Sequence, residues 1–196
     1  MADFSTRELY GGAITSELPS AYFDATSVRQ VPDHQEVYLS PEQLTSLIFE
    51  INQYVSFGND VGAVQLHFSD VIEQPDHLDG QSSAPKLINL VRDSVKDFPA
   101  YIIQGTIVSP EIDKVASALP VEWQQNPKTK DYFTKALLIV IRLAKYGTDF
   151  CIRINVPLRE LTPEQAIAEE QYASEIIEKI VGTLDIKDFG LFGAAE

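Results

Sequence analysis

Cysteine and histidine are scarce in this chain, and their scarcity excludes several kinds of site. The single cysteine, Cys151, has no partner for an intramolecular disulfide and cannot by itself build a structural zinc site. The three histidines, His34, His67 and His77, do not stand at metal-ligand spacing. No Gly-x-Ser-x-Gly elbow, dinucleotide fingerprint or Gly-Lys-Ser/Thr loop occurs either. We therefore expect no metal, no cofactor and no catalytic chemistry.

Long apolar runs and targeting signals are also missing. No apolar run approaches the roughly 20 residues that a membrane-spanning helix needs. The first eight residues lack the basic and apolar regions of a secretory signal, and no Lys/Arg-rich cluster resembles a nuclear localisation signal. We expect a soluble intracellular protein, without a membrane span, that is small enough to diffuse between cytoplasm and nucleus.

Positive charge is in short supply. The chain has 29 acidic and 15 basic residues in 196, a formal net charge of −14. Such a chain repels phosphate backbones, so a nucleic-acid partner is not expected, whereas a basic protein partner is favoured. The plainer alternative is that the charge only keeps the protein soluble. The hydrophobic fraction of 44% indicates a folded globular protein, which we expect to be a monomer.

Two segments begin with a strong helix-start signal. In Ser40-Pro41-Glu42-Gln43 the serine can cap, the proline suits the first helical position, and the glutamine completes a capping-box spacing. Thr162-Pro163-Glu164-Gln165 repeats this pattern. An apolar stripe follows each start, made of Leu44, Leu47, Ile48, Ile51, Tyr54 and Val55 in one case and of Ala173, Ile176, Ile177, Ile180, Val181 and Leu184 in the other. We predict two amphipathic helices, the first ending at Gly58-Asn59.

A β-hairpin is predicted in the second half of the chain. Within 132–145, the run from Ala136 to Ile141 is too continuous for a strand with one solvated face, which indicates a central strand covered on both faces. The turn at 146–149 and the apolar run 150–156 predict its antiparallel partner. Cys151 lies in that run and is expected to be a buried small hydrophobe.

Other segments complete the predicted fold. Strands are expected at 8–18, with a bulge at Gly11-Gly12, at 35–39, and at 100–108, where Ser109-Pro110 ends the strand. The segment 61–71 fits either a helix or a strand, and loops are expected at 74–85 and at 120–130, which includes Trp123. The predicted class is α+β: one domain over 1–196, with a mainly antiparallel sheet layered between helices.

An acidic turn near the N-terminus is the remaining candidate site. Pro32 biases the preceding residue towards an extended conformation, and Asp33 after it favours a turn. Glu36 follows three residues later; on a helical turn the two carboxylates share a face, and on a strand they do not. We expect both acids to project together from the turn. The alternatives are an Asx-turn with a solvated Glu36, and a general acid–base pair.

The order of several motifs resembles one family, the Ran guanine-nucleotide release factors. The most specific match is Val31-Pro32-Asp33-His34-Gln35-Glu36-Val37. The other matching pieces, which run over nearly the whole chain, are Leu9-Tyr10-Gly11-Gly12-Ala13-Ile14, Asp24, Arg29, Arg142-Leu143, Tyr146, Thr148-Asp149, Ile154-Asn155-Val156-Pro157-Leu158 and Leu191-Phe192-Gly193.

This resemblance implies a fold, a function and a site. The fold is a PsbP-like α/β/α sandwich with an antiparallel central sheet. The function is binding of the small GTPase Ran and release of its guanine nucleotide, in support of transport between nucleus and cytoplasm. The implied Ran-contacting residues are Asp33 and Glu36, with Arg29, Pro32 and Gln35 as neighbours and Asp24 capping or bracing the same region.

Three alternatives to this function stay open. The first is an acidic adaptor that binds Ran or another basic partner without exchange activity. The second is a PsbP-like protein of photosynthetic membranes, which the missing transit segment argues against. The third is a small hydrolase that uses Asp33 and Glu36, for which no pocket signature is visible.

Overall fold

An antiparallel sheet forms the centre of the molecule. The computed structural model describes residues 3–42, 45–56, 58–111, 130–158 and 161–193. The main sheet has the strand order β3-β4-β5-β10-β9-β8-β6, with β7 also paired to β8. Its strands are β3 (Phe23–Asp24), β4 (Gln35–Leu39), β5 (Ser46–Gln53), β6 (His77–Leu78), β7 (Lys86–Ile88), β8 (Ala100–Glu111), β9 (Lys130–Leu143) and β10 (Thr148–Pro157).

The predicted hairpin is confirmed and lies in the middle of this sheet. Strands β9 and β10 pair antiparallel, with Ile139 opposite Ile152. Their connection ends at Gly147, whose φ of 61° lies in the left-handed region that glycine adopts without strain. The side chains of the run from Ala136 to Ile141 are all buried, as expected for a strand covered on both faces. Strand β8 continues past Ser109-Pro110 to Glu111, because β9 pairs with it to that point.

The predicted helix after Ser40 is wrong, since this segment is strand β5. Strand β5 pairs with β4 on one side and with β10 on the other. Leu47 and Phe49 are fully buried on one face and Ile48 is 6% exposed on the other, so the strand has apolar residues on both faces. In a strand with apolar residues on both faces, some of those residues also fall at helical spacing. Here the segment is a strand because it pairs with a neighbour on each side.

The ambiguous segment 61–71 is a helix. Helix α1 (Asp60–Asp70) begins after Asn59, whose side chain accepts a hydrogen bond of 2.8 Å from the backbone N–H of Gly62. The connection that follows is irregular, as predicted, apart from the two residues of β6. The loop predicted at 120–130, with Trp123, falls almost wholly on residues outside the described ranges.

A second, smaller sheet is built from the two ends of the chain. It contains β1 (Phe4–Leu9), β2 (Ile14–Pro19) and β11 (Asp185–Ile186) in the order β1-β2-β11. The expected single strand over 8–18 with a bulge is therefore two strands of a hairpin. The short 3-10 turn η1 (Tyr10–Gly12) joins them, and Gly11 and Gly12 adopt φ angles of 66° and 92° there. Glycine permits this reversal because it has no Cβ.

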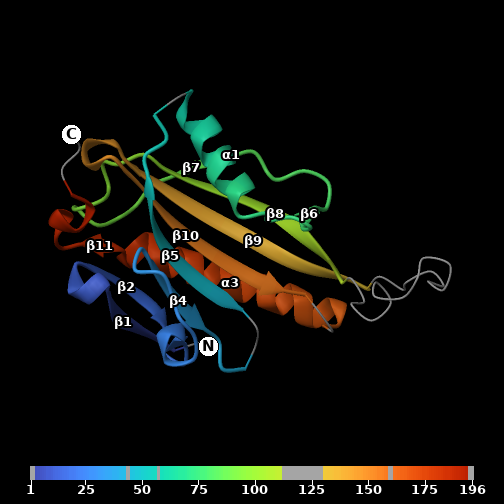
Figure 1. Cartoon of the computed structure of the whole chain (residues 1–196). Helices are drawn as coiled ribbons and strands as arrows, with labels where there is room; N and C mark the ends of the chain where they lie inside the picture. Colours follow the sequence, from blue (N-terminus) through green and yellow to red (C-terminus); the bar gives the residue numbers. More distant parts are fainter. Residues whose placement is uncertain (1–2, 43–44, 57, 112–129, 159–160, 194–196) are drawn as a thin grey trace.

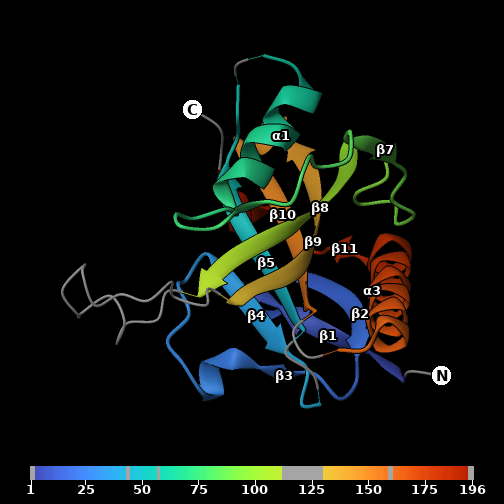
Figure 2. The ribbon, with the colours of Figure 1, turned by 90° about the vertical axis from the view of Figure 1, so that its right-hand side faces the viewer.

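Helices cover both faces of the main sheet. Helix α3 (Pro163–Thr183) starts at the predicted capping box of Thr162 and Gln165, and it buries Ala173, Ile176 and Ile180. It lies with the small sheet on one face, while α1 lies on the other (Figures 1 and 2). The main core is enclosed between the central strands, the small sheet and α3. The predicted α+β class, with an antiparallel sheet between helices, is confirmed. In the described ranges, no helix combines the length and apolar character needed to cross a bilayer.

Candidate functional site

The turn at Asp33 is exposed and tightly closed. The backbone N–H of Gln35 donates to the carbonyl of Pro32 at 2.9 Å, which defines a β-turn with Asp33 and His34 at its tip. Pro32, Asp33 and His34 are all exposed. Within the described part of the chain, no hydrogen bond or ion pair engages the Asp33 carboxylate, so the alternative of a capping Asx-turn is not observed there. The carboxylate is thus available to a partner.

Glu36 does not project from this turn with Asp33, which corrects the sequence expectation. Strand β4 begins at Gln35, so successive side chains point to opposite faces of the sheet. Glu36 Oε1 accepts a hydrogen bond of 2.5 Å from the backbone N–H of Tyr10, and Oε2 lies 3.4 Å from the Tyr38 hydroxyl, which donates to it. Glu36 therefore fastens η1 to the main sheet.

The half-buried position of Glu36 affects its protonation. Loss of solvent raises the pKa of the Glu36 carboxyl above its ordinary value of 4.5, the Tyr10 N–H partly offsets this, and the nearby charge of Asp24 adds to the rise. A raised folded-state pKa means that the folded protein holds this proton more tightly than the unfolded chain. Its contribution to stability is complete below pH 4.5 and is lost as the pH rises through the folded pKa.

A pair of substitutions separates the hydrogen bond from the charge. We expect Glu36→Gln to weaken the decline of unfolding free energy above pH 4.5, because the amide keeps an acceptor for Tyr10 but does not titrate. Glu36→Ala leaves the Tyr10 N–H without this acceptor and is expected to lower the unfolding free energy by about 1–2 kcal/mol. Urea denaturation between pH 4 and pH 8 measures both. Equal stability of the two variants at pH 7 would contradict the role assigned to this hydrogen bond.

Gln35 faces the opposite side of the sheet, towards α1. Its side-chain amide donates to Glu50 Oε1 at 2.6 Å, and His34 Nε2 lies 3.5 Å from the same oxygen. Gln35 and Glu50 are cross-strand neighbours in the β4–β5 register. They line a polar surface cavity of about 340 Å³, together with Asn52, His67, Asp70, Glu73 and Arg153. Sequence reasoning missed Glu50, because it assigned this segment to a helix.

Asp24 braces the segment that leads to the turn, as expected. Its Oδ1 accepts a 2.8 Å hydrogen bond from the backbone N–H of Thr26 and caps the 3-10 turn η2 (Ala25–Ser27). Asp24 lies opposite Tyr38 in the β3–β4 register, which places it near Glu36. Arg29 follows η2 and is exposed. The six predicted residues thus occupy one end of the main sheet, with Asp24 and Glu36 towards one face and Gln35 towards the other.

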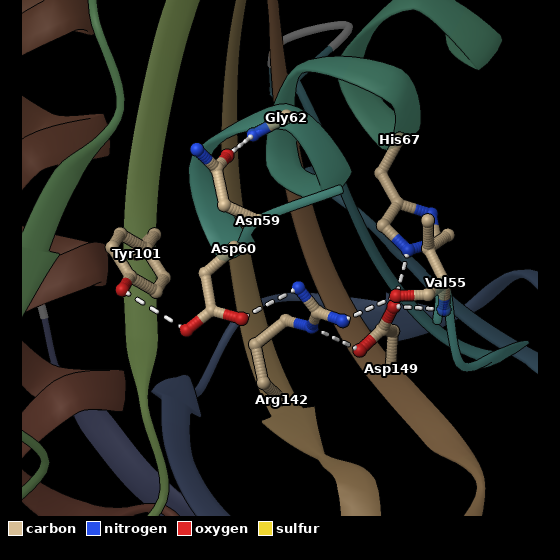
Figure 3. A network of polar contacts seen from close by, with 8 residues as sticks. All are labelled: Val55, Asn59, Asp60, Gly62, His67, Tyr101, Arg142 and Asp149. Atoms are coloured by element: carbon tan, nitrogen blue, oxygen red, sulfur yellow. Dashed lines mark hydrogen bonds and ion pairs between the residues drawn. The ribbon is translucent and has the colours of Figure 1, made fainter. Parts of the chain in front are cut away.

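A buried polar network adjoins the polar cavity through Val55 and His67, and the sequence did not predict it as a unit (Figure 3). Arg142, only 3% exposed, donates from Nε to Asp149 Oδ1 at 2.7 Å and from Nη1 to Asp60 Oδ1 at 2.9 Å. Its Nη2 donates to the carbonyl of Val55 at 2.6 Å. The guanidinium also stacks 4.2 Å from the centre of the Tyr54 ring. Every arm of this buried cation is paired.

The second oxygen of Asp149 extends the network to α1. Asp149 Oδ2 accepts from the Val55 N–H at 2.9 Å and lies 2.8 Å from His67 Nε2, while Asp60 Oδ2 accepts from the Tyr101 hydroxyl at 3.2 Å. The network therefore ties both ends of the β5–α1 connection to the β9–β10 hairpin (Figure 3). Because these charges satisfy one another, we assign the network a positioning role: it holds α1 and one wall of the polar cavity.

No metal or nucleophile site is evident in the parts described. No group of three or more His, Cys, Asp or Glu residues there is placed to hold a metal ion. Cys151 is 3% exposed, and burial raises the pKa of its thiol to about 12. It is the buried small hydrophobe that the sequence predicted.

Comparison with known proteins identifies the family of this chain and tests its predicted fold. The family model described as Ran-interacting Mog1 protein matches residues 7–157. The chain belongs to the Mog1 family. Relatives of this Mog1-family chain include a probable Ran guanine nucleotide release factor of Dictyostelium discoideum, 23% identical over 96% of both chains. Another is the nuclear import protein MOG1 of Saccharomyces cerevisiae, 29% identical over 94% of this chain and 83% of the relative. The Ran guanine nucleotide release factor of Bos taurus is 28% identical over 94% and 95%.

Solved structures confirm the fold expected of a Mog1-family chain. The Saccharomyces cerevisiae Ran-binding protein Mog1p superposes with a TM-score of 0.64 at 23% identity, covering 98% of this chain and 100% of that one. The PsbP protein of Synechocystis superposes with a TM-score of 0.53 at 8% identity, covering 95% and 94%. The predicted PsbP-like fold is therefore confirmed, and at these identities the superpositions speak only to fold.

Proposed function

We propose that this protein binds the small GTPase Ran and promotes release of its guanine nucleotide, in support of transport between nucleus and cytoplasm. The observation that carries the proposal is the exposed Asp33 carboxylate, held on a closed turn in a chain of the Ran-interacting Mog1 family. The protein acts by binding, as a monomer present in nucleus and cytoplasm, and performs no catalytic chemistry.

The release factor and the nucleotide both bind the GTPase, so the effect of each on the binding of the other is linked. The release factor accelerates nucleotide loss only by favouring the nucleotide-free state of the GTPase, and nucleotide weakens its binding by the same factor. A hundredfold effect requires about 2.7 kcal/mol of differential binding, which one or two charge-assisted hydrogen bonds supply. The contacts of one free carboxylate can therefore supply a binding free energy of this size.

Asp33 is the residue best placed to provide this energy. Its carboxylate can pair with a basic group of the GTPase that otherwise serves phosphate, or it can disturb the Mg²⁺ of the nucleotide site. The surrounding contacts are assigned to Pro32, Arg29, Asp24, Gln35 and the exposed part of Glu36. The net charge of −14 adds attraction towards a basic surface and makes the association rate fall as salt rises.

A fluorescent-nucleotide release assay tests the function directly. Purified wild-type protein is expected to accelerate release from Ran in a concentration-dependent and saturable way. It is also expected to bind nucleotide-free Ran more tightly than loaded Ran, because of the linkage described above. An unchanged release rate at saturating protein would refute the proposed exchange activity. Binding of Ran without any change in release would instead favour the adaptor function.

A further inference from the structure

Val28 is an exposed apolar side chain on the connection that also contains Asp33. It is 65% exposed, as much as any large apolar side chain in the described part of the chain. It lies on the connection between β3 and β4, which also carries Arg29 and Asp33. Scattered exposed apolar residues are ordinary on a protein surface, so exposure alone assigns nothing. Val28 differs from a scattered surface residue in where it lies and in how its backbone is held.

The backbone beneath Val28 is pinned rather than loose. Its N–H donates to the carbonyl of Ala25 at 3.0 Å, and the N–H of Arg29 donates to the same carbonyl at 2.9 Å. Ala25 is itself fully buried against Val37 and Ile48 of the main sheet. Val28 therefore projects from a turn anchored in the core. A valine on such a turn has few rotamers to lose, so its burial by a partner has a small entropic cost.

The surroundings of Val28 match the anatomy of a protein interface. Asp24 precedes it, Arg29 follows it, and the unpaired Asp33 carboxylate lies further along the same connection. Phe23, at the start of this stretch, is also 38% exposed. Interfaces commonly place a small apolar centre inside a polar and charged rim, which excludes water from the charged contacts around it. The mostly exposed stretch from Phe23 to Asp33 has both components.

We propose that Val28 is the apolar anchor by which the β3–β4 connection docks on Ran, entering an apolar depression bordered by basic groups of the GTPase. The proposal rests on the proposed function and deepens it. Asp33 supplies the charged contact, and Val28 supplies the buried contact that slows dissociation and shields the charge from water. Neither residue replaces the other.

Val91 offers a matched control for Val28. It is 64% exposed, it lies on the connection between β7 and β8, and its N–H is bonded to the carbonyl of Val181. Val28→Ala is expected to weaken Ran binding about tenfold, because it removes two buried carbon groups from the interface. Val28→Asp is expected to weaken binding more strongly. Val91→Ala and Val91→Asp are expected to bind like wild type. Titration of nucleotide-free Ran against each variant, together with urea unfolding, measures binding and confirms folding.

The salt dependence separates an apolar anchor from a charged one. Val28→Ala is expected to raise the dissociation rate while leaving the slope of log affinity against log salt unchanged. Asp33→Ala is expected to reduce that slope, because it removes a screened charge. A reduced slope in Val28→Ala would overturn the assignment of Val28 as an apolar contact.

The outcomes distinguish this inference from the function on which it rests. If wild type binds Ran and Asp33→Lys weakens binding, while the Val28 variants behave like the Val91 variants, the anchor is wrong and the proposed function stands. If wild-type protein neither binds Ran nor changes nucleotide release, both the proposed function and the Val28 anchor are wrong. A tenfold loss confined to the Val28 variants supports the anchor.

Discussion

Replacing Asp149 by alanine is expected to lower the free energy of unfolding by about 3–5 kcal/mol. Asp149 is fully buried, and its two oxygens serve Arg142, Val55 and His67. Its removal leaves the guanidinium of Arg142, itself 3% exposed, without its nearest counter-charge. Asp60, which is partly exposed, is then the remaining carboxylate against this buried cation. Breaking a buried ion pair by removing one partner is far more destabilising than losing both partners together. Urea denaturation followed by far-UV circular dichroism measures the effect.

A surface ion pair provides the control for this prediction. Asp93 pairs with Lys96 at 2.7 Å but is 95% exposed, so Asp93→Ala is expected to leave stability unchanged within error. The double variant Arg142→Met with Asp149→Leu should lose less stability than the sum of its two single changes, because it leaves neither Arg142 nor Asp149 buried without the other. Strict additivity in this double-mutant cycle would argue against the direct coupling seen in Figure 3.

Reversing the charge of Asp33 is expected to have the largest effect on partner binding. We expect Asp33→Lys to weaken binding of nucleotide-free Ran at least a hundredfold, about 2.7 kcal/mol, and to abolish accelerated release at concentrations where wild type is active. The change sets a lysine against a basic surface and removes an unpaired acceptor. Stability should not change, because Asp33 is exposed and no contact within the described residues depends on it.

Asp97→Lys is the matched control, since it changes the net charge by the same amount. Asp97 is exposed on the segment before β8, at the opposite end of the main sheet order from β4. Both variants weaken long-range attraction equally, so only a specific contact distinguishes them. If Asp97→Lys is as defective as Asp33→Lys, the Asp33 turn is not the contact site, and general electrostatic steering explains the binding.

Local signals were enough to predict some elements of the fold. The hairpin of β9 and β10 follows from two apolar runs around a glycine turn, and α3 follows from a capping box ahead of an apolar stripe. The segment of strand β5 was predicted to be a helix because the spacing of its apolar residues fits both a helix and a strand. Its true state depends on β10, which lies about a hundred residues away in sequence. Pairing of this kind is absent from any local pattern.

The candidate site was only partly predictable for the same reason. The motif around Asp33 identified the turn, but the direction of Glu36 depends on β4 beginning at Gln35. The pairing of Arg142 with Asp149 follows from the hairpin register, in which they are direct neighbours. Their contacts with Asp60 and His67 arise only when α1 docks, because those residues lie 82 positions away from their partners.

Because Glu36 already accepts a hydrogen bond from Tyr10, Glu36 and Asp33 differ in how readily they can bind a cation of a partner. A basic group that reaches Glu36 must displace or share the Tyr10 amide, so the energy gained there is a difference between two bonds. Asp33 meets no such rival within the described chain. Hydrogen exchange at the Tyr10 amide therefore reports whether a bound partner contacts Glu36. The exchange rate is expected to rise when the partner draws Glu36 away from this amide, and to stay constant when the partner engages only Asp33.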